Sequence, residues 1–298
     1  MKKIKMCILI LTLIFISSCG NQSINNKNWY YSSINVEQLW KYSKGKSQTI
    51  AIIDTGISNY AKKLYKDRII GTYNSLEKNS NVTDENGHGT EMTSIVIGNG
   101  KHGVWGIAPK ANVIIIKAIG ANGTVKPESI ANAIEYAVSK KVSVINMSFG
   151  SFISNKKIKY QINNAIKNHI SVVAAAGDYG NKDLLFPASM KGVISIEAKN
   201  KKNKIWNSSN ISPTAVAAFP GEKIKTISWR IGSNKKYIIS YSSGTSEATA
   251  IASGYIALLR DHYVKKHIEF TNSMIVKKMQ LIRSTSVENP DYLISFRK

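Results

Sequence analysis

The stretch VSVINMSFGSFISNKKIKYQINNAIKNHISVVAAA, residues 142–176, decides the fold. It begins with an apolar run at residues 142–147 and ends with a second one at residues 171–176. Near-continuous apolar runs of this length are typical of strands that are buried on both faces of a parallel sheet. Between them, residues 156–168 carry apolar side chains at helical spacing, including Ile158 and Ile162. The stretch therefore predicts a strand, a helix and a second strand parallel to the first.

The same alternation continues on both sides of this stretch. Apolar runs at residues 49–53, 112–117 and 193–196 predict three further strands, and residues 127–139 predict a helix that starts at a proline. We therefore expect an α/β fold with a doubly wound, mostly parallel sheet flanked by helices. The length of 298 residues suits a single large domain of this kind.

The composition is that of a globular protein with a strongly basic charge balance. Hydrophobic residues make up 43% and charged residues 20% of the chain, which excludes a mainly disordered protein. The 41 Lys and Arg residues against 18 Asp and Glu residues give a net charge of +23, which attracts anionic partners. No nucleic-acid-binding motif accompanies this charge, so we expect no nucleic acid partner. The two cysteines, Cys7 and Cys19, both lie in the first 20 residues. The rest of the chain therefore can form neither a disulfide nor a site with a cysteine nucleophile.

The N-terminus has the features of an export signal. A cationic start precedes an apolar run at residues 6–16 that is too short to span a bilayer, and the run ends in ISSCG at residues 16–20. This resembles a bacterial lipoprotein signal over residues 1–19, in which Cys19 is lipidated. An ordinary signal peptide or a short membrane anchor is the alternative. We expect a polar tether at residues 20–28, a folded domain at residues 29–298, and anchoring that leaves the domain facing outward from a bacterial membrane.

Three short motifs supply an acid, a base and a nucleophile. Asp54 follows directly after a predicted strand, at the edge where open α/β sheets place their sites. His88 lies between two glycines, and Ser246 opens a segment of small residues that predicts a helix. Each residue alone fits an ordinary role as a turn cap, a loop histidine or a helix N-cap. Together they are what nucleophilic catalysis requires, because a serine needs a base and the base needs an acid that fixes its tautomer.

In their chain order, these motifs resemble those of subtilisin-like serine proteases, and the resemblance extends from about residue 29 to residue 291. VINMSFG at residues 144–150 is similar to the substrate-binding strand of that family, and VVAAAGD at residues 172–178 is similar to its oxyanion-hole segment. The resemblance implies a serine endopeptidase without a cofactor, in which the backbone N–H of Ser246 contributes to the oxyanion hole. The short loop at residues 98–106 implies no calcium at that place, and we expect no metal. The substrate-binding residues that it implies are Ser148, Phe149, Gly150, Ala174, Ala175, Ala176, Gly177, Gly120 and Asn122.

The chain departs from the family pattern in the oxyanion-hole segment. Asp178 stands where the family usually has Asn, and an ionised carboxylate cannot donate a hydrogen bond to the developing oxyanion. Loss of one such donor costs about 10²–10³ in rate. Three explanations remain open: Asp178 is protonated, Asn181 supplies the amide instead, or the enzyme is slow. Glu91 and Ala250 also replace a usual His and a usual Pro.

Size and charge suggest a dedicated processing protease. Within the family, the chain most resembles the leader peptidases of lanthipeptide (lantibiotic) precursors, whose substrates carry acidic leaders that a basic protein would attract. For the charge alone, a solvated, Lys-rich surface is the simpler explanation. A broad-specificity surface protease and a non-catalytic peptide-binding lipoprotein are the alternatives. We expect a monomer whose partners are a precursor peptide and the membrane.

Overall fold

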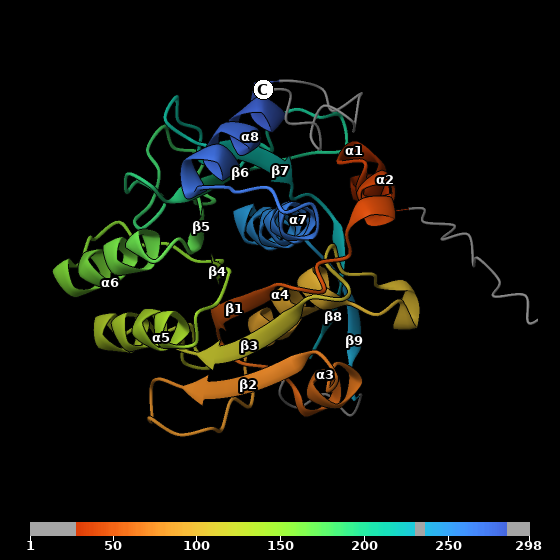
Figure 1. Ribbon diagram of the computed structural model, residues 1–298. Helices are drawn as coiled ribbons and strands as arrows, with labels where there is room; N and C mark the ends of the chain where they lie inside the picture. The colour runs from red at the N-terminus through yellow and green to blue at the C-terminus, as the bar shows by residue number, and fades with distance from the viewer. Residues whose placement is uncertain (1–27, 230–235, 285–298) are drawn as a thin grey trace, which may run out of the picture.

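The computed structural model describes residues 28–229 and 236–284. Its main feature is a seven-stranded sheet in the order β2-β3-β1-β4-β5-β6-β7, in which all neighbouring strands are parallel (Figure 1). A second, antiparallel pair is formed by β8 and β9. The bounds are β1 (Thr49–Asp54), β2 (Ile69–Asn74), β3 (Asn112–Lys117), β4 (Val144–Met147), β5 (Ser171–Ala175), β6 (Ile194–Lys199), β7 (Ala217–Pro220), β8 (Ile224–Ser228) and β9 (Ile238–Ser242).

Helices cover both faces of the sheet. In Figure 1, α5 and α6 lie on one face, and α4 and α7 lie on the other. The bounds are α1 (Trp29–Ser33), α2 (Val36–Tyr42), α3 (Asn59–Leu64), α4 (His88–Ile97), α5 (Pro127–Ser139), α6 (Lys156–Lys167), α7 (Thr245–Lys265) and α8 (Asn272–Ser284), with a 3₁₀ turn at Lys101–Gly103. The predicted α/β fold with a doubly wound parallel sheet in one domain is confirmed.

The two faces of the sheet explain the apolar runs in the sequence. In β1, Ile50 and Ile52 pack into the core under α4 and α7, whereas Ala51 and Ile53 pack into the core under α5 and α6. All four side chains are completely buried. Because the strand order reverses beside β1, the carboxyl end of this strand lies at the switch point where open α/β sheets place their sites.

The observed elements differ from the predicted ones mainly at their ends. The strand predicted at residues 142–147 begins at Val144, and the helix predicted from Ser246 begins one residue earlier and continues to Lys265. The strands β2, β7, β8 and β9 were not predicted. Cys19 and most of the predicted tether lie outside the described residues.

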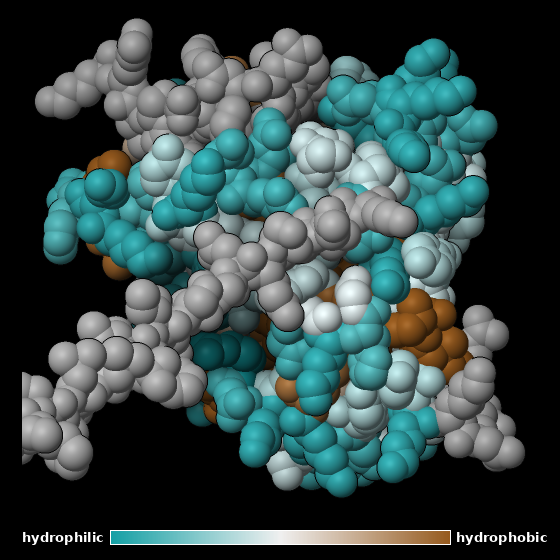
Figure 2. All heavy atoms as spheres, turned by 90° about the vertical axis from the view of Figure 1, so that its right-hand side faces the viewer, coloured by the Kyte–Doolittle hydropathy of each residue, from teal (hydrophilic) through white to brown (hydrophobic). Residues whose placement is uncertain are grey.

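The surface is mainly hydrophilic on the side where the chain enters the domain. Figure 2 shows this face largely in teal, with small separate brown patches. Trp29 Nε1 donates a hydrogen bond of 3.1 Å to the carbonyl of Glu222, and Trp40 Nε1 donates one of 2.8 Å to Ile107. These bonds dock the first two helices onto the domain. Among residues 28–229 and 236–284, no helix combines the length and apolarity that crossing a membrane requires.

Candidate active site

The acid and the base meet at the carboxyl end of the sheet. Asp54 is the last residue of β1 and is 1% exposed, and His88 is the first residue of α4. His88 Nδ1 lies 2.7 Å from Asp54 Oδ1, which also accepts the N–H of Thr55 at 2.8 Å. A carboxylate in this position holds the proton on Nδ1 and leaves Nε2 free to accept one. This is the arrangement that a general base requires.

Asp84 holds the loop that carries His88. Its buried carboxylate accepts hydrogen bonds from the hydroxyl of Thr55 (2.9 Å), the N–H of Gly87 (2.8 Å) and both the N–H (3.0 Å) and the hydroxyl (2.6 Å) of Thr90. Gly87 has φ +107°, and a Cβ there would stand 2.3 Å from the carbonyl oxygen of Trp229. Glycine is therefore required at this turn. The sequence interpretation did not identify Asp84, although an acid four residues before the candidate base was a usable signal.

Ser246 is the second residue of α7, which packs against α4. Its Oγ donates a hydrogen bond of 2.9 Å to the carbonyl of Ser148, and the hydroxyl of Ser148 donates one of 2.9 Å to the carbonyl of Ser246. Buried Asn146 donates to the same Ser148 hydroxyl at 3.1 Å. Within the described chain, no hydrogen bond joins Ser246 Oγ to His88. Such catalytic hydrogen bonds often form fully only when substrate binds.

Several carboxylates surround His88, whose side chain is 31% exposed. Burial lowers the pKa of His88, but Asp54, with further contributions from Glu247 and Glu91, outweighs it and raises the pKa above its usual value. A base must be neutral to take a proton, so the fraction of competent enzyme increases as the pH rises through this raised pKa. The site is therefore suited to alkaline rather than acidic conditions.

Asp178 lies at the N-terminus of α7, the helix that carries the candidate nucleophile Ser246. Its Oδ1 accepts the N–H of Thr245 at 2.8 Å, where a negative charge is favourable to the helix. Asn181 is held elsewhere, because its N–H donates to Asn210 Oδ1 at 3.3 Å and its carbonyl accepts the N–H of Ile211 at 2.8 Å. In the described part of the chain, no hydrogen bond links the Asn181 side chain to α7. Asp178 is therefore bonded to the residue that precedes Ser246, and Asn181 to the segment at Asn210 and Ile211.

A cavity of about 280 Å³ opens beside the predicted substrate-binding strand. Phe149 and Gly150 form part of its wall. Gly120 and Asn122 lie in the turn that leads to the opposite wall, where the N–H of Gly120 donates to the Thr124 carbonyl (3.0 Å) and Asn122 Oδ1 accepts the Thr124 N–H (3.0 Å). The apolar residues that complete the lining are Val125, Pro127, Ile130, Ile153, Ile158, Phe186 and Pro187.

The alanines of the predicted oxyanion-hole segment belong to the core. The side chains of Ala174, Ala175 and Ala176 are at most 3% exposed, so they do not line an open pocket. Gly177 follows them with φ +113°, and its N–H donates to the hydroxyl of Thr245 at 3.1 Å. The segment thus supports the N-terminus of α7 rather than forming a wall of side chains.

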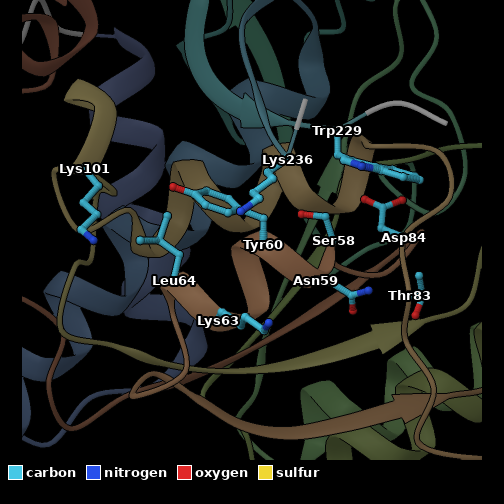
Figure 3. A pocket seen from close by; sticks show the side chains of 10 residues that line it. All are labelled: Ser58, Asn59, Tyr60, Lys63, Leu64, Thr83, Asp84, Lys101, Trp229 and Lys236. Carbon is cyan, nitrogen blue, oxygen red and sulfur yellow. The ribbon is translucent and has the colours of Figure 1, made fainter. Parts of the chain in front are cut away.

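A second cavity, of about 590 Å³, adjoins the histidine loop (Figure 3). Asp84 and Trp229 form one part of its lining, and Lys63, Lys101 and Lys236 give it a positive charge. It was not predicted from the sequence. Over residues 28–229 and 236–284, no three His, Cys, Asp or Glu side chains are grouped closely enough to hold a metal ion.

Known proteins resemble this chain over most of its length. Residues 45–292 match the family model described as the Subtilase family. The major intracellular serine protease of Bacillus subtilis (strain 168) is 34% identical over 264 residues, which cover 85% of this chain and 80% of that protein. The minor extracellular protease Epr of the same organism is 32% identical over 82% of this chain, but the match spans only 37% of Epr. Thermitase of Thermoactinomyces vulgaris is 28% identical over 76% of this chain and 79% of its own length.

Proposed function

Because this chain belongs to the subtilase family and is a subtilisin-like serine endopeptidase, we propose that it cleaves peptide bonds through Ser246, His88 and Asp54. The observation that supports these roles most directly is the 2.7 Å contact between His88 Nδ1 and the buried Asp54 carboxylate. It leaves Nε2 as the proton acceptor. Replacement of Ser246 and of His88 by alanine tests the assignment.

In this mechanism, Ser246 Oγ leaves the carbonyl of Ser148 and attacks the scissile carbonyl carbon while His88 Nε2 takes its proton. The C=O bond becomes a single bond, and the resulting oxyanion is held by the free N–H of Ser246 at the N-terminus of α7. His88, whose positive charge Asp54 stabilises, then gives the proton to the leaving amine as the C–N bond breaks. A water molecule then attacks the acyl-enzyme in the same way, with His88 as the base. The ester bond to Ser246 breaks, and the carboxylic acid product is released.

The proposed substrate is a lanthipeptide precursor with an acidic leader. The cavity beside Phe149 and Gly150 has an apolar lining that suits an apolar side chain of an extended peptide. Exposed lysines lie at its rim: Lys159 Nζ stands 6.0 Å from the centre of the Phe186 ring, and Lys156 begins α6. Together with the net charge of +23, they would steer acidic residues of the leader to this groove.

Neutralising the acidic residues of the leader should lower kcat/KM mainly at low salt. The reason is that screening at about 0.15 M salt limits the reach of exposed charges to roughly 8 Å. The double variant K156Q/K159Q should show the same loss, measured as initial rates on one leader peptide at several salt concentrations.

The control is K110Q/K266Q, which removes the same charge from two exposed lysines away from the carboxyl edge of the sheet. It should keep the wild-type salt dependence. Equal turnover of casein and a leader-bearing precursor would contradict the dedicated role and favour a broad-specificity protease.

The proposed location is the outer face of a bacterial membrane, with Cys19 as the lipid-carrying residue. The support lies where the chain enters the domain: Trp29 is bonded to Glu222, whose carboxylate also accepts the N–H of Lys201 at 3.4 Å. Lys201, Lys202 and Lys204 are exposed there. Stable anchoring requires two acyl chains or one chain with a basic patch, and a diacylglyceryl cysteine with these lysines meets that need.

Cys19→Ser should abolish incorporation of a labelled fatty acid and leave the protein uncleaved or released from the membrane. The reason is that serine lacks the thiol that forms the thioether to the diacylglyceryl group. Fractionation and lipid labelling of the two forms measure the effect. Wild-type protein found solely in the cytosol would refute the location.

A further inference from the structure

Glu247 directly follows the proposed nucleophile and turns a carboxyl group inward. The side chain is 4% exposed, although glutamate is rarely buried without a partner. A Cβ on Gly244 would stand 2.9 Å from Glu247 Oε2 and 2.7 Å from Asp178 Oδ2. Glycine at this position therefore leaves room for two carboxyl groups to converge beside the N-terminus of α7.

Among residues 28–229 and 236–284, the surroundings of Glu247 contain other acids but no cation paired with it. α4 contributes His88 and Glu91, the segment after β5 contributes Asp178, and β9 contributes the neighbouring buried hydroxyl of Ser242. None of the ion pairs found in the described residues involves Glu247. His88 begins α4, which packs against α7, and it interacts electrostatically with Glu247; it becomes a cation when it takes the serine proton.

The protonation of Glu247 fits such a role. Burial raises the pKa of Glu247 to about 7, and the positive charge of His88 opposes this rise. Glu247 is therefore ionised in the alkaline range in which neutral His88 can act as a base. A carboxylate at that place favours the protonated form of His88, in the same sense as Asp54 does.

We propose that Glu247 is a positioning residue that acts through His88: its carboxylate stabilises the imidazolium that forms during catalysis and makes His88 a stronger base. This inference rests on the proposed function, because it presupposes that His88 accepts the proton of Ser246. Asp54 orients the ring, and Glu247 adds charge without a direct hydrogen bond to it.

The test is the pH dependence of kcat/KM for the wild type, E247Q, E247D and E91Q on one peptide. Without the Glu247 charge, less stabilisation of the imidazolium lowers the pKa of His88, so E247Q should reach half of its plateau about one pH unit below the wild type. Its plateau kcat should fall up to about tenfold, because a weaker base transfers the proton less readily. E247D keeps the charge and should stay close to the wild-type profile.

E91Q is the matched control, because it removes the same charge from a more exposed residue of α4 that also faces His88. Its shift should be smaller and should disappear in high salt, whereas the shift of E247Q should persist. Equal shifts in E247Q and E91Q, or a wild-type profile in E247Q, would overturn the inference.

A second readout does not depend on turnover. In the S246A background, proton NMR of the His88 Nδ1–H signal should give a lower His88 pKa with E247Q than without it. An unchanged His88 pKa would refute the role of Glu247 while leaving the triad intact. Full activity of S246A would instead refute the proposed function itself. Thermal unfolding of each variant checks that it is folded.

Discussion

Ser246→Ala should reduce kcat by about 10⁶-fold, and His88→Ala should reduce it by a similar factor. The magnitude is taken from subtilisin, in which the same three residue types act as a unit. Without the hydroxyl there is no acyl-enzyme, and without the imidazole nothing takes the serine proton. The double variant should be hardly worse than either single one, which initial rates on a chromogenic peptide would measure.

The folding control for these variants is the unfolding midpoint. Ser246→Ala removes one hydroxyl whose partner is the Ser148 carbonyl, so its midpoint should stay within a few degrees of the wild type. A wild-type kcat in Ser246→Ala would contradict the assignment. So would a double variant whose loss of kcat equals the product of the two single losses.

Asp178→Asn should raise kcat by up to about 10²–10³-fold. The Asn oxygen can keep the hydrogen bond from the Thr245 N–H, which Asp178 Oδ1 now accepts at 2.8 Å. The amide nitrogen then adds a donor beside the N–H of Ser246, where the oxyanion develops. The gain should appear in kcat with little change in KM, because the new bond strengthens in the transition state.

Asp178→Ala separates the two contributions of this substitution. It removes the negative charge without supplying a donor, so its kcat should lie well below that of Asp178→Asn. If Asp178→Asn lowers kcat across the whole pH range, the carboxylate has another role, and holding a basic substrate side chain becomes the leading explanation.

The five inner strands of the sheet could be predicted from the sequence, and the two edge strands, β2 and β7, could not, although β7 is buried. β1, β3 and β5 appear as apolar runs because helices cover them on both sides. β2 lies at the edge of the sheet, and its Ile70 is 57% exposed. Its residues therefore form neither a continuous apolar run nor a regular alternation of apolar and polar side chains. The end of α7 was missed because its last turns contain Arg260 and Asp261, which are buried although they are charged.

The same distinction applies to the site. Asp54, His88 and Ser246 each sit in a short local motif, so the sequence alone was enough to single them out. Glu247 stands in the motif of Ser246, but its burial depends on Gly244 and on helices distant in the chain. Asn210 fixes the Asp178 loop by accepting the N–H of Tyr179 at 2.9 Å, a contact between residues 31 positions apart. Such contacts form only when the chain folds, so no local sequence pattern predicts them.

The most direct test of the central claim is labelling with a fluorophosphonate probe followed by peptide mapping. The probe forms a covalent bond with a serine oxygen only where a base activates that serine, so it reports the nucleophile without requiring the true substrate. We expect one labelled serine, Ser246, and loss of labelling in His88→Ala. Absence of labelling in the folded wild type, or labelling at another serine, would contradict it and favour a peptide-binding protein without catalytic activity.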